Sequence, residues 1–217
     1  MPKKVYLVRH GESLHGAQER YQAGDNPLSE RGIMQAQSVA RRFSSIPIDR
    51  VYTSPFPRVH KTAELINEVI KKEIVVLDIL RELKRPGEFV GKSVKDPEIV
   101  RIKKIMREHA YDPAWHYSDE ENFYELRDRV HKALQIIEQD SHERLLVVSH
   151  AVLMKVFALV MIMGEKATHE EYDAFYHHLR LTQTGITVFE KGTQGWLLMT
   201  WNDYAHLGED TTEAAYK

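Results

Sequence analysis

The sequence predicts an α/β fold of three layers, in which helices cover both faces of a central sheet. Three observations support this fold class. Short, uninterrupted apolar runs are typical of strands that are buried on both faces. Segments with helical periodicity alternate with these runs along the chain. Two apolar segments near the C-terminal end are joined by a short turn, which predicts a hairpin. With 217 residues, 42% of them apolar, the chain can form such a core as a single domain, 1–217.

Four apolar runs in the first 150 residues are the expected central strands. They read "KVYLVRH", "RVYTS", "IVVL" and "RLLVVSH", at residues 4–10, 50–54, 74–77 and 144–150. β-branched and other apolar residues dominate these runs, as they do in buried strands. Two further segments, "GITVFEK" and "WLLMTWN", at 185–191 and 196–202, flank the turn "GTQG". We expect these two to pair as antiparallel strands.

Helical patterns fill the intervals between the strands. Ser29 is the expected N-cap of a helix in "LSERGIMQAQSVARRF", where apolar residues recur every three or four positions. The same spacing recurs in "RVHKTAELINEVIKK" and in "FYELRDRVHKALQIIEQ". Residues 151–164, "AVLMKVFALVMIMG", form the longest apolar stretch, and Lys155 interrupts it. This stretch is too short to cross a bilayer, so we expect a helix that packs on the sheet.

Residues 84–121 break the alternation of strands and helices. They are charged, contain several prolines and hold one expected helix, "DPEIVRIKKIMREHA". We interpret them as an insertion that covers a site, since long insertions in α/β enzymes often do so. The aromatic triplet Trp115, His116 and Tyr117 lies in this insertion. It either lines a substrate pocket or packs within the insertion itself. The last residues, about 208–217, are expected to form a flexible tail.

The composition argues against several classes of protein. The formal net charge is -2, from 30 basic and 32 acidic residues, whereas general nucleic-acid binders have a basic excess. Cysteine is absent, so disulfides and thiolate chemistry are excluded and a reducing compartment is favoured. The 12 histidines show no spacing typical of a metal site. Because the N-terminal apolar run is too short for a signal peptide, we expect a cytoplasmic protein with no membrane or nucleic-acid partner.

Charged side chains follow the expected strands at the points where these strands end. Arg9 and His10 follow the first strand, and His150 follows the fourth. Arg58 lies in the first turn of the helix after the second strand, and Glu82 follows the third. In α/β sheets, ligands sit beyond the carboxyl ends of the strands. The sequence therefore predicts that these five side chains meet at one edge.

This set of groups suits the chemistry of a phosphate ester. Two guanidiniums can bind a phosphate dianion with bidentate geometry. A histidine held beside them can attack phosphorus and form a phosphohistidine, which water then hydrolyses. A carboxylic acid such as Glu82 can protonate the departing alkoxide. Gly11 removes a side chain where the backbone would approach the phosphate.

Motifs along nearly the whole chain resemble those of the histidine phosphatase superfamily, which includes the cofactor-dependent phosphoglycerate mutases. They are "LVRHGES", "GDNPLSERGIMQA", "YTSPFPRVHKTAELI", "RELKRPGEFVGKS", "ENFYELRDRV", "LLVVSHAVLMKVF" and "WNDYAHL". The resemblance implies a mixed, mostly parallel sheet between helices, with a lid at residues 84–121. It implies no metal and no organic cofactor.

The resemblance also implies a role for each site residue. His10 would be the nucleophile, and Arg9 and Arg58 would hold the phosphoryl group. His150 would donate a hydrogen bond to this group and stabilise the transition state. Glu82 would be the acid and later the base that activates water.

Two features depart from the family pattern. Gly16 stands where many members carry an asparagine that contacts phosphate, so one phosphate ligand is missing or replaced. The segment after Glu82 is one residue longer than the common pattern and contains Pro86. Glu88 and Glu12 therefore remain alternative candidates for the acid.

Three functions are compatible with the motifs. The favoured one is a phosphomonoester hydrolase that acts on a small phosphorylated metabolite. The second is a mutase, an isomerase that returns the phosphoryl group to a neighbouring hydroxyl and must exclude water. The shorter chain and the mixture of acids and bases in residues 84–121 favour the hydrolase. The third is a non-catalytic protein that binds a phosphorylated ligand. The sequence predicts neither the substrate nor the oligomeric state.

Overall fold

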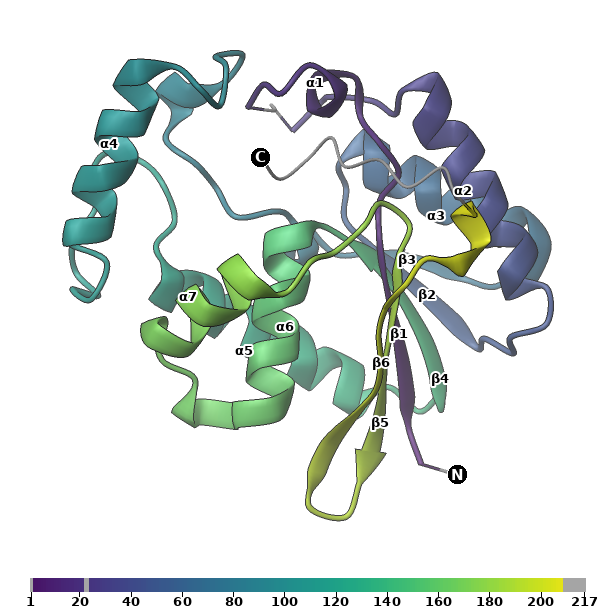
Figure 1. Ribbon diagram of the computed structural model, residues 1–217. Helices are drawn as coiled ribbons and strands as arrows, with labels where there is room; N and C mark the ends of the chain where they lie inside the picture. Colours follow the sequence, from purple (N-terminus) through teal and green to yellow (C-terminus); the bar gives the residue numbers. More distant parts are fainter. Residues whose placement is uncertain (1, 22–23, 209–217) are drawn as a thin grey trace.

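The computed structural model describes residues 2–21 and 24–208. Within these residues, helices flank a six-stranded sheet in the order β3-β2-β4-β1-β5-β6 (Figure 1). The strands are β1 (Lys4–Arg9), β2 (Arg50–Thr53), β3 (Ile74–Val76), β4 (Arg144–Ser149), β5 (Ile186–Gly192) and β6 (Gly195–Asp203). Apart from Gly208, the tail expected at 208–217 lies outside the described residues.

The sheet is mixed and mostly parallel, as the family resemblance implied. β4 pairs with β1 and with β2 in parallel, and β2 pairs with β3 in parallel. β5 runs antiparallel to β1, and β6 antiparallel to β5, which confirms the C-terminal hairpin. The carboxyl ends of the four parallel strands therefore meet at the same edge of the sheet.

The helices begin and end close to where the periodicity placed them. They are α1 (Leu14–Ala17), α2 (Glu30–Phe43), α3 (Pro57–Ile70), α4 (Pro97–Glu108), α5 (Phe123–Gln139), α6 (Ala151–Met163) and α7 (His169–His178). Ser29 caps α2 as expected, because its hydroxyl accepts a hydrogen bond from Gly32 N at 3.0 Å. The sequence did not indicate α1 or α7. α1 is only four residues long, and α7 has no buried side chain that would give it an apolar stripe.

The surroundings of β4 explain why apolar and polar residues do not alternate in its sequence, as they would in a strand with one exposed face. Successive side chains point to opposite faces of a sheet. Leu145 and Val147 pack into the cluster that includes the buried faces of α5 and α6. Leu146 and Val148 pack into the cluster that includes those of α2 and α3. Since both faces are covered, every position of the strand interior is apolar, and the three-layer prediction is confirmed (Figure 1).

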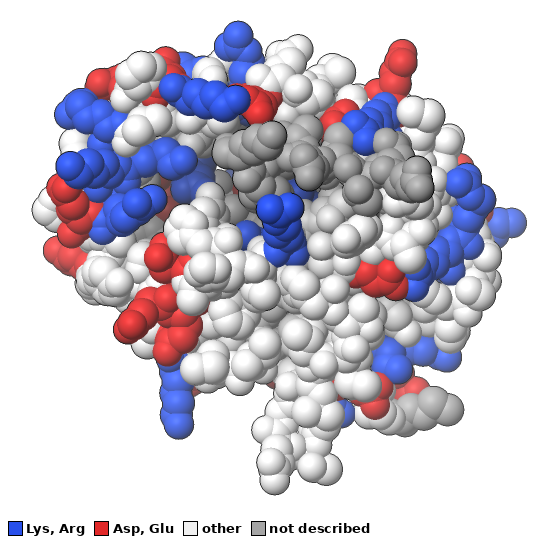
Figure 2. All heavy atoms as spheres, in the orientation of Figure 1, with Lys and Arg blue, Asp and Glu red and all other residues white. Residues whose placement is uncertain are grey.

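The inserted segment 84–121 leaves the sheet and carries α4, which lies apart from the central layers (Figure 1). It has a small apolar cluster of its own, formed by Phe89, Ile99 and Ile102. On the face shown in Figure 2, lysine and arginine side chains gather in the region of α4, with acidic side chains among them. No helix in the described part of the chain is long and apolar enough to cross a membrane.

Candidate active site

Two histidines and an arginine from three different strand ends meet at the carboxyl edge of the sheet. His10 follows β1, His150 follows β4, and Arg58 is the second residue of α3. Nε of Arg58 lies 3.4 Å from Nε2 of His10, and Nη2 of Arg58 lies 3.3 Å from Nδ1 of His150. The two imidazole rings lie 5.3 Å apart, centroid to centroid. This agrees with the prediction that side chains at the carboxyl ends of the parallel strands meet at one edge of the sheet.

A cavity of about 770 Å³ opens at this edge. Arg9, His10, Arg58 and Glu82 all line it, although they come from three separate segments of the chain. Nη1 of Arg9 donates a hydrogen bond to the carbonyl oxygen of Leu181 at 2.5 Å. Two guanidiniums, an imidazole and a carboxylate therefore share one hollow that is large enough for a small metabolite.

The hydrogen bonds of His10 define which ring nitrogen carries the proton. Nδ1 lies 2.7 Å from the carbonyl oxygen of Gly11, which can only accept, so we assign the proton to Nδ1. Nε2 then has a free lone pair, toward which Arg58 points. Burial, followed by the charges of Arg58 and Arg9, holds the pKa of His10 well below its ordinary value. The site thus keeps this imidazole neutral, as a nucleophile requires.

His150 is fully buried and is held from both sides. Nδ1 faces Arg58, and Nε2 lies 3.1 Å from the hydroxyl of Ser54. Because a guanidinium can only donate, Nδ1 accepts and Nε2 carries the proton. Burial, then the charges of Arg58 and His10, lowers the pKa of His150. Burial also lowers the pKa of Arg58, to about 10.

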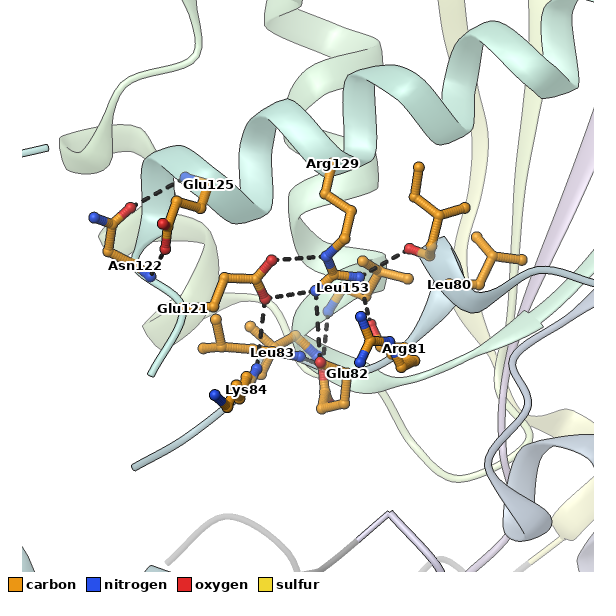
Figure 3. Close-up of polar contacts among 12 residues, drawn as sticks. Leu80, Arg81, Glu82, Leu83, Lys84, Glu121, Asn122, Glu125, Arg129 and Leu153 are labelled. Atoms are coloured by element: carbon orange, nitrogen blue, oxygen red, sulfur yellow. Dashed lines mark hydrogen bonds and ion pairs between the residues drawn. The ribbon is translucent and has the colours of Figure 1, made fainter. Parts of the chain in front are cut away.

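The carboxylate of Glu82 accepts hydrogen bonds from backbone N–H groups at the start of α6. Its Oε2 lies 3.2 Å from Val152 N, and its Oε1 lies 3.1 Å from Leu153 N (Figure 3). Oε1 also accepts from Leu83 N at 3.0 Å. His150, the N-cap residue of α6, makes no capping bond with its side chain, so Glu82 satisfies these donors instead. A negative side chain is also favoured there by the helix dipole.

Arg129 of α5 holds the segment that carries Glu82, a role that the sequence did not reveal. Its guanidinium binds Glu121 through two hydrogen bonds, of 2.7 and 2.6 Å (Figure 3). It also donates to the carbonyl oxygens of Ile79, at 2.8 Å, and Arg81, at 2.7 Å. The motif "ENFYELRDRV" contains this arginine, but helical periodicity places charged residues on an exposed face and gives no sign of such contacts.

The two alternative acids lie elsewhere. Glu88 is exposed, and Glu12 is buried and accepts a hydrogen bond from the hydroxyl of Ser29 at 2.8 Å. Neither is among the lining residues of the cavity, whereas Glu82 is. Of the three candidates, Glu82 therefore has the best position to reach a bound ester.

The structure shows a packing role for Gly11, beside the approach to phosphate that the sequence suggests. A Cβ atom at Gly11 would lie 2.4 Å from the carbonyl oxygen of Gly32 in α2. The Gly11 N–H donates to the hydroxyl of Thr62 at 3.2 Å. Gly11 thus permits close packing of two backbone segments. Gly16 lies in the short helix α1, where its N–H bonds the hydroxyl of Ser13 at 3.3 Å, and it does not line the cavity.

The aromatic triplet of the inserted segment lies outside the lining of this cavity. Trp115 stacks on His109, at 4.5 Å between centroids, and lines a smaller cavity of about 200 Å³. His116 pairs with Glu125 at 3.0 Å, and Tyr117 packs on the small cluster around Phe89. Among residues 2–21 and 24–208, no group of three His, Asp or Glu side chains could hold a metal ion.

Comparison with known proteins identifies the class to which this fold and site belong. Residues 5–204 match the histidine phosphatase superfamily (branch 1), so the chain belongs to that superfamily. It is 28% identical over 222 residues to "Probable phosphoglycerate mutase GpmB" of Proteus mirabilis, with 94% of each chain covered.

Two solved structures show the same similarity in three dimensions. One is phosphoserine phosphatase from Entamoeba histolytica in complex with phosphoserine, with a TM-score of 0.77 and 25% identity. The alignment covers 94% of this chain and 99% of that one. The other is YhfR of Bacillus stearothermophilus, with a TM-score of 0.80 and 24% identity over 94% and 99% of the two chains. A structure named as a phosphatase thus shares this fold, and a sequence relative is named as a probable mutase.

Proposed function

We propose that the protein is a phosphomonoester hydrolase that acts on a small phosphorylated metabolite through a phosphohistidine on His10. The observation that carries this proposal is the environment of His10. Its ring is neutral, its Nε2 lone pair is directed toward Arg58, and Arg9 lines the same cavity. A neutral nucleophile beside two cations is what attack on a phosphate dianion requires.

In the first step, Nε2 of His10 forms a bond to phosphorus while the bond from phosphorus to the ester oxygen breaks. Arg58 and Arg9 stabilise the charge on the equatorial oxygens. Arg58 now donates to both imidazoles, and a phosphate oxygen is a stronger acceptor that would take over these hydrogen bonds. His150 does not line the cavity, and its Nδ1 accepts from Arg58. It would donate to the phosphoryl group only after Arg58 has moved to the phosphate and Nδ1 has gained a proton.

Glu82 supplies the proton that the alkoxide needs as it leaves. In the second step the carboxylate takes a proton from water, whose oxygen attacks phosphorus and releases His10 and inorganic phosphate. The backbone donors of α6 fix the position of this carboxylate. No step requires a metal ion.

A phosphoglycerate mutase-type transfer is the second candidate. Its support is the similarity to the GpmB protein over 94% of both chains. The two reactions share the first step and differ in the acceptor, which is water in one and a second hydroxyl in the other. A protein that only binds a phosphorylated ligand would use the same cations without turnover.

Labelling distinguishes the three candidates. After brief reaction with a ³²P-labelled ester and alkaline denaturation, we expect an acid-labile label on His10 and release of phosphate. The His10→Ala variant should lose both, whereas His15→Ala, outside the cavity, should keep both. Isomerisation of phosphoglycerate that depends on a bisphosphate primer would favour the mutase. Binding without label or turnover would favour the third candidate, and full activity of His10→Ala would refute the mechanism.

A further inference from the structure

Arg85 lies on a rigid part of the cavity wall. The backbone is anchored on both sides of it: Lys84 O accepts from Glu121 N at 3.0 Å, and Gly87 N donates to Asp119 at 2.9 Å. The side chain of Arg85 is half-buried and lines both the main cavity and the smaller one beside it. It therefore stands where the two cavities adjoin.

Arg85 has no hydrogen-bond or ion-pair partner within residues 2–21 and 24–208. The two carboxylates that line both cavities are engaged elsewhere. Glu120 accepts from the backbone N–H groups of residues 117 and 118, and Glu121 binds Arg129. Glu82 is held by the start of α6. None of these three carboxylates forms an ion pair with Arg85, although Glu82 attracts its charge electrostatically.

Three tyrosines share the cavity walls with Arg85. Tyr176, Tyr172 and Tyr21 act on it electrostatically, together with Glu82. Tyr172 and Tyr176 line the smaller cavity, and Tyr21 lines the main one. A guanidinium and phenolic hydroxyls can all donate hydrogen bonds, so their common complement is an anionic oxygen acceptor. The flat fork of a guanidinium fits the paired oxygens of a carboxylate or a phosphate.

We propose that Arg85 is a specificity residue that binds a second oxyanion on the leaving group of the substrate. This inference rests on the proposed phosphatase function and names its substrate class. Arg9 and Arg58 hold the ester phosphate at the strand ends. Arg85 holds a carboxylate or second phosphate carried by the alcohol, at the entrance to the smaller cavity. The walls of that cavity include the rings of Trp115 and Tyr172, which suit a flat leaving group.

Paired esters test this assignment. We would compare kcat/KM for 4-carboxyphenyl phosphate with kcat/KM for 4-carbamoylphenyl phosphate, which has a similar size and no second charge. The wild-type protein should prefer the carboxylate by about tenfold or more, the size expected of a charge-assisted hydrogen-bonded pair. Arg85→Gln should remove most of this preference, mainly through KM. Arg81→Gln is the matched control, because Arg81 lines the same cavity but pairs with Asp78 at 3.0 Å.

A third ester, 1,4-phenylene bisphosphate, distinguishes the two sources of the anion. If Arg85→Gln lowers kcat/KM more for the bisphosphate than for 4-carboxyphenyl phosphate, the group that Arg85 binds is a second phosphate. If it lowers kcat/KM more for 4-carboxyphenyl phosphate, the group is a carboxylate. The proposal is overturned if Arg85→Gln leaves both preferences unchanged, or if Arg81→Gln changes them equally. If the wild-type protein hydrolyses none of the esters, the phosphatase function fails. Calorimetric binding of 4-carboxyphenyl phosphate to wild type and Arg85→Gln would then still decide the role of Arg85.

Discussion

Replacement of Glu82 by glutamine separates its chemical role from its structural one. In the native protein, Oε1 accepts two backbone hydrogen bonds and Oε2 accepts one from Val152 N at 3.2 Å. In Glu82→Gln the amide oxygen can replace Oε1, but the amide NH₂ then faces the Val152 N–H. An unsatisfied donor of this kind costs about 1–3 kcal/mol. For a chain of this length, the melting temperature should fall by roughly 2–12 °C.

The catalytic effect should depend on the leaving group. An alkoxide needs a proton as it departs, so Glu82→Gln should slow hydrolysis of glycerol 2-phosphate by about 10²–10⁴-fold. 4-Nitrophenolate leaves readily without a proton, so kcat/KM for 4-nitrophenyl phosphate should fall far less. The exposed Glu88 provides the matched control, and Glu88→Gln should leave the hydrolysis rates of both esters unchanged. Equal losses on both esters, or the same pattern in Glu88→Gln, would refute the assignment.

Two further predictions concern the nucleophile and the packing beside it. Arg58→Met removes a charge that lowers the pKa of His10, so this pKa should rise in an NMR titration of the imidazole. Arg81→Met should leave it unchanged, and an unchanged pKa in Arg58→Met would contradict the electrostatic argument. Gly32→Ala would place a Cβ 2.0 Å from a backbone carbonyl oxygen, so denaturant unfolding should show a loss of about 3 kcal/mol or more. Gly87→Ala, with its nearest contact at 3.4 Å, should show little loss, and equal losses would exclude the packing explanation.

The convergence of His10, Arg58 and His150 could be predicted because it depends only on backbone topology. Each follows a parallel strand, and parallel strands deliver their carboxyl ends to one edge of the sheet. The alternation of apolar runs and helical patterns was sufficient to order the elements. The charges of Arg58 and Arg9 lower the pKa of His10, but burial has the larger influence, and the sequence gives no measure of burial at a single position.

Contacts between segments distant in the sequence could not be predicted. The capping of α6 by Glu82 joins residues that are 70 and 71 positions apart, and no local pattern indicates it. Arg129 reaches back 48 and 50 positions to two carbonyl groups, which any arginine on a helix surface could in principle do. The contact between Gly11 and Gly32 could not be predicted either, because Gly32 lies on another element.

The anchoring of Glu82 makes the position of its carboxylate independent of the inserted segment 84–121. Its carboxylate is fixed by α6, and its backbone neighbours are fixed by Arg129 of α5, so both supports belong to the helices that cover the sheet. The inserted segment begins only two residues later. A variant with a loop of another length or composition would therefore still hold this carboxylate in place. Under the proposed function, one set of strand-end residues could in this way serve many different alcohols.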